Sequence, residues 1–386
     1  MRFRLTFLIV TFIAGIFPVN SQILTLQGQL SGWTYLSGEK FSDSQLGIRY
    51  IPSLFAEKYF PNNLSVDAEL SVNTVGAATF DNFDRFLKDA SLQPYRMWLR
   101  FAGSQFELRG GLQKIDFGTS TLLRSLRWFD SIDPRDPLQL TTGVYGVLGK
   151  YYFLNNANLW VWGLYGNGDP KGWEIFGTAD DNIEFGGRVQ YPIATGELGF
   201  SYHQRKYDFN KNILGIMLPA ERIVPEQRYA LDGKWDLEVG LWFETTLTKQ
   251  DLSFADLLFK YRNFLTLGVD YTFGVGTGLY TMAEHLVISQ GNELSKLQQS
   301  TNFTAWTANY SLGLLDRISA IVYYDWNEKQ VFRFASISRL YNQWSIYVNL
   351  FWNPEDAGLG IGDLRPDMEN TFGVGKGIQI MAVFNH

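Results

Sequence analysis

Six charged residues gather in one short stretch of the chain. They are three arginines and three aspartates: Arg124, Arg127, Asp130, Asp133, Arg135 and Asp136. Guanidinium groups pair with carboxylates in fixed geometry, and rings of fixed charge select solutes in narrow channels. The spacing therefore predicts a rigid, ion-paired segment that could orient or select dipolar and anionic solutes.

A second set of charges lies on segments in which polar and apolar residues alternate. Because alternate residues of a strand share a face, Arg96, Arg100 and Arg109 would point to the same side of a sheet, as would Glu107 in its strand. Further residues of this set are Lys150, Arg188, Arg205, Glu184 and Glu197, followed by a mixed group of Arg228, Lys234, Lys260, Arg262, Asp232, Glu238, Glu244, Asp256 and Asp270. We expect one side of an enclosed space to be basic and the other mixed. The alternative is that these charges pair with each other and stiffen the wall.

Few residues have the spacing of a catalytic or metal site. Ser201 and His203 share a strand face, which leaves an outer-membrane hydrolase of the phospholipase type as an alternative. Residues two apart on a strand lie about 6.6 Å from each other, which is long for a nucleophile–base hydrogen bond. The sequence shows no metal-ligand cluster, phosphate loop or nucleotide fingerprint. We therefore expect no enzyme activity and no cofactor.

The elements that carry these residues are predicted to be strands. Alternation with a period of two, interrupted by Gly, Asn and Asp, dominates the chain and indicates an all-β fold. We expect about 18 strands, within a range of 16 to 20. They lie near 24–37, 43–56, 63–79, 93–103, 104–115, 144–154, 156–167, 181–193, 195–208, 226–236, 237–250, 252–262, 264–290, 300–313, 316–328, 329–340, 343–354 and 372–385.

The connections between these strands alternate between short and long. Short turns such as Asn155–Asn156, Arg262–Asn263 and Gly313–Asp316 follow the even-numbered strands. The long connections are 80–92, 117–143, 168–180, 209–225, 290–299 and 355–371. Outer-membrane barrels have this asymmetry, with short periplasmic turns and long outer loops, whereas a β-sandwich gives no reason for it. The sequence thus predicts a transmembrane, antiparallel, up-and-down β-barrel with a long loop after strand five.

Residues on single strands support a lipid-facing band. Over 344–352 the even positions are all apolar, and over 265–273 the odd positions are apolar while Thr266 and Asp270 face the other way. Aromatic residues gather near strand ends, for example at Tyr59 and Tyr151, as an interfacial girdle requires. A barrel of this size leaves a channel in its centre, so the inward charges would line a lumen.

Composition agrees with an exported membrane protein. Residues 1–21 have a basic start, an apolar run and small residues before Gln22, which predicts a signal peptide, and 22–386 would form the barrel. The chain has no cysteine, so its stability does not depend on disulfides, and 16% of its residues are aromatic. Its net charge of −6 argues against nucleic acid as a partner. No plug domain precedes the first predicted strand, which argues against a TonB-dependent transporter.

The 117–143 loop contains a candidate helix. Ser120 could cap it, and Leu122, Leu126 and Phe129 would share one face. Pro134 would end it, because a residue before proline is pushed out of the helical region. An apolar helix face in a wet pore needs a wall to pack against, so we expect the loop to fold inward and constrict the pore. The alternative is an outward lid.

One pattern resembles several families of bacterial outer-membrane channels. In this chain it runs over 111–120 as Gly-Leu-Gln-Lys-Ile-Asp-Phe-Gly-Thr-Ser and over 132–137 as Ile-Asp-Pro-Arg-Asp-Pro. Those families have Arg where Leu112 stands, Trp in place of Phe117 and Asn in place of Asp133. The resemblance covers about 30 residues and implies a porin-like channel, with no indication of its substrate.

We therefore expect a porin-like channel in the cell outer membrane for passive passage of small polar solutes, anionic ones among them. Its partners would be outer-membrane lipid, lipopolysaccharide, the barrel-assembly machinery and the solutes, and it would be a homotrimer or a monomer. The alternative is a non-conducting structural or adhesive barrel, and an outer-membrane hydrolase is the third reading.

Overall fold

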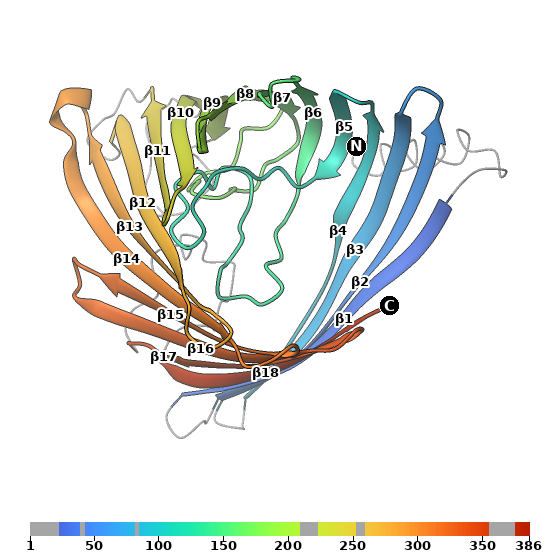
Figure 1. The fold of residues 1–386 in the computed structure, drawn as a ribbon, viewed down its shortest axis with the longest axis vertical. Coiled ribbons are helices and arrows are strands. Elements are labelled where there is room, and N and C mark those ends of the chain that lie inside the picture. Colours follow the sequence, from blue (N-terminus) through green and yellow to red (C-terminus); the bar gives the residue numbers. More distant parts are fainter. Residues whose placement is uncertain (1–22, 39–42, 82–84, 209–222, 252–258, 355–374) are drawn as a thin grey trace.

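The strands of the chain close into a single barrel (Figure 1). The computed structural model describes residues 23–38, 43–81, 85–208, 223–251, 259–354 and 375–386. Over these ranges 18 antiparallel strands form one sheet in sequence order, and the first strand pairs with both the second and the last. Closure removes the sheet edges, so every strand can satisfy its backbone groups on both sides, as a bilayer requires. The predicted fold class is confirmed.

The strand bounds are as follows: β1 (Ile23–Ser37), β2 (Asp43–Phe60), β3 (Leu64–Asp81), β4 (Arg85–Ala102), β5 (Phe106–Gln113), β6 (Val144–Tyr152), β7 (Asn158–Leu164), β8 (Glu184–Ile193), β9 (Gly196–Asp208), β10 (Ile223–Asp236), β11 (Gly240–Gln250), β12 (Tyr261–Phe273), β13 (Leu279–Gly291), β14 (Gln298–Ser311), β15 (Asp316–Asp325), β16 (Gln330–Leu340), β17 (Trp344–Trp352) and β18 (Lys376–Asn385). A short 3-10 helix, η2 (Leu294–Lys296), precedes β14.

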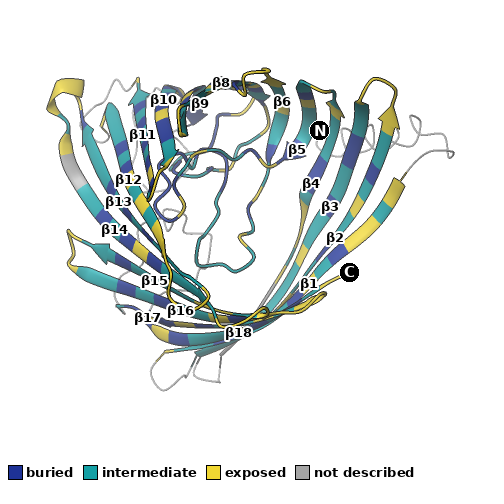
Figure 2. Cartoon of the chain, in the orientation of Figure 1, coloured by how far each residue is buried: buried dark blue, intermediate teal, exposed yellow. Residues whose placement is uncertain are grey.

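The two faces of the strands differ as alternation predicts (Figure 2). On β12, Leu267 and Val269 on the outer face are 53% and 40% exposed. Phe264 and Thr266, which point to the inner face of the same strand, are buried. Exposed apolar side chains recur on the outer faces of the other strands, for example Leu108 on β5 and Val161 on β7. These side chains form the apolar outer band of a membrane-embedded barrel.

Two strand assignments from the sequence are wrong. The 264–290 segment is two strands, β12 and β13, joined by a turn at 274–278 in which Gly276 and Gly278 have positive φ angles of 58° and 101°. The 252–262 segment is not a separate strand, since 261–262 begin β12 and 252–258 lie outside the described residues. The expected short turn at Arg262 is therefore absent. Arg262 lies instead at the end of the barrel that carries the long connections, because it is at the start of β12. Alternation continues through the hairpin, so periodicity alone did not reveal the turn.

The rule of short and long connections survives this correction. The short connections still follow the even-numbered strands, while 114–143 and 165–183 are the longest that are fully described. The predicted loop at 80–92 is wrong over most of its length, because β3 extends to Asp81 and β4 begins at Arg85. The signal peptide, Asp256, the 355–371 loop and residues 209–222 lie outside the described residues. Among the described residues, no helix is long and apolar enough to cross a membrane.

Candidate pore constriction

The loop 114–143, here called the first inward loop, lies inside the barrel (Figure 1). It leaves the wall after β5 and reaches the inner faces of β11 and β13 before it returns to β6. Inward folding agrees with the expectation from the sequence. The candidate helix after Ser120 is wrong, because the loop has only turns, bends and irregular backbone.

Two buried glutamates on the wall hold this loop through its backbone. Glu284 on β13 accepts hydrogen bonds from the backbone N–H groups of Thr121 at 2.7 Å, Leu122 at 2.8 Å and Leu123 at 2.6 Å. In a helix capped by Ser120 these three N–H groups would have no partner within the helix either, so Glu284 binds donors that a helix leaves free. The helix is opposed further along the loop, because the Leu126 N–H, which would bond to the Leu122 carbonyl in a helix, binds Glu244 instead at 3.1 Å.

Glu244 on β11 has the same role for the flanking residues. It accepts hydrogen bonds from the N–H groups of Thr119, of Ser120 at 2.7 Å and of Leu126 at 3.1 Å. Both glutamates are completely or almost completely buried. Sequence reasoning placed Glu244 on the inner face but not as an anchor, and it missed Glu284, because the contacting residues are far apart along the chain.

Arg124 and Asp130 lie in the interior of the first inward loop. The Arg124 guanidinium binds the carboxylates of Asp130 and Asp116, and only 10% of its side chain is exposed. Burial alone would lower the pKa of Arg124, but the two carboxylates raise it above its ordinary value. The predicted ion pairing is present, yet these groups stabilise the loop and do not present charge to a solute.

The tip of the loop carries three more of the predicted charges, Asp133, Arg135 and Asp136. Asp133 accepts bidentate hydrogen bonds from Arg135, whose guanidinium lies 5.3 Å from the ring centroid of Phe334 on β16. Burial would raise the pKa of Asp133, but Arg135 lowers it below its ordinary value. Burial raises the pKa of Asp136, which accepts a hydrogen bond from the N–H of Leu138 at 3.0 Å. The first inward loop thus touches the wall opposite its attachment.

A second inward loop, 165–183, locks the first one in place. Trp173 donates its indole N–H to the carbonyl of Arg124 at 2.8 Å, and the Arg127 guanidinium lies 4.5 Å from the Trp173 ring centroid. At Gly172, where φ is +51°, a Cβ atom would lie 1.7 Å from the Arg127 carbonyl oxygen. Only glycine allows this approach of two backbones.

The second inward loop also brings two charges into a buried network that the sequence did not reveal. Glu174 binds Arg228 at 2.8 Å and Arg205 at 3.0 Å. Lys171 binds Glu184 at 3.1 Å. The sequence had placed Arg205, Arg228 and Glu184 on the inner face, but the partners from the 168–180 loop carried no recognisable signal.

The predicted basic residues on β4 and β5 form a cluster with acidic neighbours. Arg100 lies 2.7 Å from Asp67 and 3.7 Å from Glu107, and Arg109 lies 2.9 Å from Glu107. Arg96 donates to the carbonyl of Thr141 at 3.1 Å and so supports the return of the first inward loop. Ion pairing therefore neutralises part of the positive charge that we expected on this side of the lumen. Such pairing is the alternative that the sequence left open.

Within this cluster the cations are more exposed than the anions. Side-chain exposure is 31% for Arg100 and 19% for Arg109, but 9% and 10% for Asp67 and Glu107. The guanidinium groups therefore form the solvent-facing layer of the cluster.

An aromatic cluster fills the base of the first inward loop. Phe117, which stands at the Trp position of the channel pattern, stacks on Trp162 at 5.6 Å between ring centroids and contacts Trp128 and Phe129 edge to face. Arg188 lies 5.2 Å above the Phe117 ring. These contacts fix the point at which the loop leaves the wall.

The described residues do not show a hydrolase site. The Ser201 hydroxyl accepts a hydrogen bond from Arg188, and His203 lies between the Trp162 indole and Glu184. Among the described side chains no hydrogen bond joins Ser201 to His203. In the same part of the chain, no group of three His, Asp or Glu residues is placed to hold a metal ion.

Comparison with known proteins identifies the fold. No protein-family model and no curated protein sequence matches the chain. Among solved structures, OccK5 (OpdH) of Pseudomonas aeruginosa is similar with a TM-score of 0.54, 10% identity and coverage of 95% of this chain and 98% of that one. In vitro folded OmpT of Vibrio cholerae, an outer membrane protein in its trimer form, has a TM-score of 0.52, 12% identity and coverage of 95% and 100%.

A third structure, Salmonella typhi OmpF in complex with daunomycin, has a TM-score of 0.50, 10% identity and coverage of 94% of this chain and 97% of that one. The fold is thus that of the outer-membrane porin barrels. Together, the porin fold and the apolar outer band are those of a barrel in the outer membrane of a cell.

Proposed function

We propose that this chain is a channel for passive passage of small polar solutes across the outer membrane. The observation that carries the proposal is the first inward loop, anchored to the inner faces of β11 and β13 by Glu244 and Glu284. A loop that is fixed inside a wide barrel narrows the lumen and sets what passes.

We further propose a preference for anionic solutes over cationic ones. The support is the exposed guanidinium layer of Arg100 and Arg109 over the less exposed Asp67 and Glu107. Charges at a constriction act on passing ions with little screening by solvent.

A second candidate function, a non-conducting barrel, is favoured by the extent of filling. The two inward loops bind each other, and their charges join a buried network with β8, β9 and β10. Such a barrel would use its outer loops to bind a partner.

Planar-bilayer recording of refolded protein distinguishes the two functions. A channel gives discrete current steps, and deletion of residues 120–137 gives larger ones, because it removes most of the first inward loop. Absence of steps both before and after the deletion would overturn the channel proposal, and retained cell-surface binding would then favour the non-conducting barrel.

We propose three partner interactions and keep the hydrolase alternative, and each has its own test. Chemical cross-linking in native membranes distinguishes a homotrimer from a monomer. Depletion of the barrel-assembly machinery tests whether insertion needs it, and extraction with bound lipopolysaccharide tests that contact. The hydrolase alternative predicts lipid or peptide hydrolysis that His203→Ala abolishes.

A further inference from the structure

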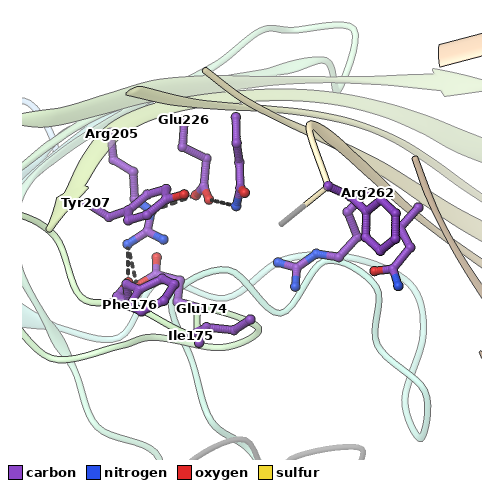
Figure 3. A pocket seen from close by; sticks show the side chains of 10 residues that line it. Glu174, Ile175, Phe176, Arg205, Tyr207, Glu226 and Arg262 are labelled. Atoms are coloured by element: carbon purple, nitrogen blue, oxygen red, sulfur yellow. Dashed lines mark hydrogen bonds and ion pairs between the residues drawn. The ribbon is translucent and has the colours of Figure 1, made fainter. Parts of the chain in front are cut away.

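A cavity of about 250 Å³ lies between the second inward loop and the inner faces of β9 to β13 (Figure 3). It is at the end of the barrel that carries the long loops, because its wall residues include Gln250 at the end of β11 and Arg262 at the start of β12. Phe259, which also lines it, is 45% exposed, so the cavity reaches the surface of the molecule.

The two carboxylates of the cavity wall already have cationic partners. Glu226 binds Arg205 through Nε at 2.6 Å and Arg228 at 2.6 Å. Glu174 binds the same two arginines at 3.0 Å and 2.8 Å. Two glutamates and two arginines therefore neutralise each other within this group.

Arg262 is the cation that remains. Its guanidinium lies 3.4 Å from the carbonyl oxygen of Trp173 and 5.2 Å from the ring centroid of Phe264, and its Nε is buried without a hydrogen-bond partner. In the part of the chain that the structure describes, no carboxylate forms an ion pair with it. Arg262 as a whole is half-buried, and a partly desolvated cation without an anion is costly, so a bound anion would stabilise this arrangement.

A second unpaired group points to the same ligand. Tyr207 is 0% exposed, lines the cavity, and has a buried hydroxyl without a partner. Its ring stacks on Phe176 at 5.4 Å and an interplanar angle of 8°, which holds the side chain in place. Figure 3 shows the Arg262 guanidinium directed across the cavity towards the side that carries Tyr207.

We propose that this cavity binds a small monocarboxylate. Its carboxylate would accept hydrogen bonds from Arg262 and Tyr207, and a short apolar body would pack against Phe176 and Phe259. The volume is that of roughly eight water molecules, which suits an anion such as butanoate. The single uncompensated positive charge, with Glu174 and Glu226 nearby, disfavours a dianion. Binding at this site does not require that the barrel conducts.

Isothermal titration calorimetry of the refolded mature chain in detergent tests the proposal. We expect sodium butanoate to bind, and the neutral isostere butanamide and inorganic phosphate to bind at least tenfold more weakly. Tyr207→Phe keeps the ring stacking and removes only the hydroxyl, and it should weaken butanoate binding about tenfold, the usual effect of losing a hydrogen bond to a charged group. Arg262→Gln should abolish measurable binding.

Arg317→Gln, on β15 away from the cavity, is the matched control and should leave the affinity unchanged. Equal binding of butanamide would show an apolar pocket only, and equal binding of phosphate would show a general anion site; either result overturns the proposal. Should Arg262→Gln fail to refold, an unchanged affinity in Tyr207→Phe would be sufficient to reject it. Loss of butanoate binding leaves the bilayer currents as a separate measurement, so failure here is distinct from failure of the channel.

Discussion

Two glutamate side chains hold the first inward loop against the barrel wall. Glu284 accepts three backbone N–H groups and the Trp242 indole, and Glu244 accepts three further backbone N–H groups. Buried carboxylates are stable when their lone pairs are filled in this way. In this barrel the backbone donors to both glutamates come from the first inward loop. The two carboxylates therefore keep these hydrogen bonds only while the loop is in place.

Glu284→Gln is expected to loosen the first inward loop. The amide nitrogen cannot accept a hydrogen bond, so at least one of the N–H groups of 121–123 loses its partner, at a cost of about 1.5–3 kcal/mol. The measurement is tryptic cleavage at Arg124 and Arg127, which should become faster, together with noisier bilayer currents. Glu238→Gln, an exposed turn residue on the edge of β11, is the control and should match the unmodified protein.

Asp136 is expected to produce a mild acid response at the loop tip. Burial raises its pKa above the ordinary value of about 3.9, so it takes up a proton before a normal aspartate does as the pH falls from 7. Neutral Asp136 leaves the charge of nearby Arg49 uncompensated. Reversal potentials in a salt gradient should therefore shift towards anions as the pH falls from 7, at a higher pH than an ordinary aspartate would cause, and Asp136→Asn should show that shift already at pH 7.

The same titration has a defined effect on stability. A carboxyl whose pKa is raised by folding stabilises the fold below its unfolded pKa and loses that contribution as the pH rises through its folded pKa. Asp133 behaves in the opposite way, because Arg135 lowers its pKa, so its contribution is lost only below the ordinary aspartate range. Lowering the pH from 7 towards the ordinary aspartate pKa should thus leave the tip folded. Unfolding of the tip in this range would contradict the assignment of both groups.

Arg109 is expected to contribute to ion preference. Arg109→Gln removes part of the exposed guanidinium layer and should lower the anion-to-cation permeability ratio, by an amount that grows as the salt concentration falls. Lys296→Gln, on the exposed helix η2, removes the same charge outside the lumen and should have no effect. An equal change in both variants would contradict a local role for Arg109.

At the scale of elements, the start of the first inward loop depends on one glycine. Gly118 has a φ of +112°, and a Cβ atom there would lie 2.4 Å from Glu244 Oε1. Gly118→Ala should destabilise the seated loop by about 1–2 kcal/mol or more, since both the backbone conformation and the anchor are disturbed. Hydrogen exchange of residues 119–126 would measure this, and Gly163→Ala, with nothing within 4 Å of its added Cβ, is the control.

The elements also show what local sequence can and cannot predict. Alternation gave most strand positions and the inner face of Arg100, Arg109 and Glu244, because side-chain direction in a strand follows from period two. The helix after Ser120 was wrong because Glu244, more than a hundred residues away along the chain, binds the Leu126 N–H that a helix would need for its own hydrogen bonds. Contacts of that length leave no trace in a local pattern. The cavity at Arg262 and Tyr207 was missed for the same reason.

At the scale of the whole molecule, the lipid-facing band predicts a clear asymmetry between the two sides of a strand. Leu267→Arg on the outer face of β12 should destabilise the barrel by about 2–4 kcal/mol, as charges do near the middle of a bilayer. Ser319→Arg, on the inner face of β15, should cost much less. Urea unfolding in lipid vesicles measures both, and equal losses would contradict the assignment of the faces.

The barrel interior is filled unevenly. Most of both inward loops and the ion-pair network lie against β7 to β13, while the return of the first loop is bound by Arg96 on β4 and its tip reaches β16. The strand-to-strand hydrogen bonds of the wall do not include residues 120–137, so deletion of these residues should leave the β-sheet circular dichroism and the closure of β1 on β18 intact. Loss of the folded barrel after this deletion would show that the loop is part of the core that stabilises the wall.

The anchoring of the first inward loop has a consequence for its evolution. Glu244 and Glu284 bind backbone N–H groups, and every residue except proline supplies one. The side chains at 119 and 121 can therefore change without loss of the anchors, while the two glutamates and Gly118 cannot. Related proteins could therefore change the exposed side chains of this loop and keep the backbone hydrogen bonds that hold it. We expect relatives of this chain to vary most in the loop and least at the wall residues that anchor it.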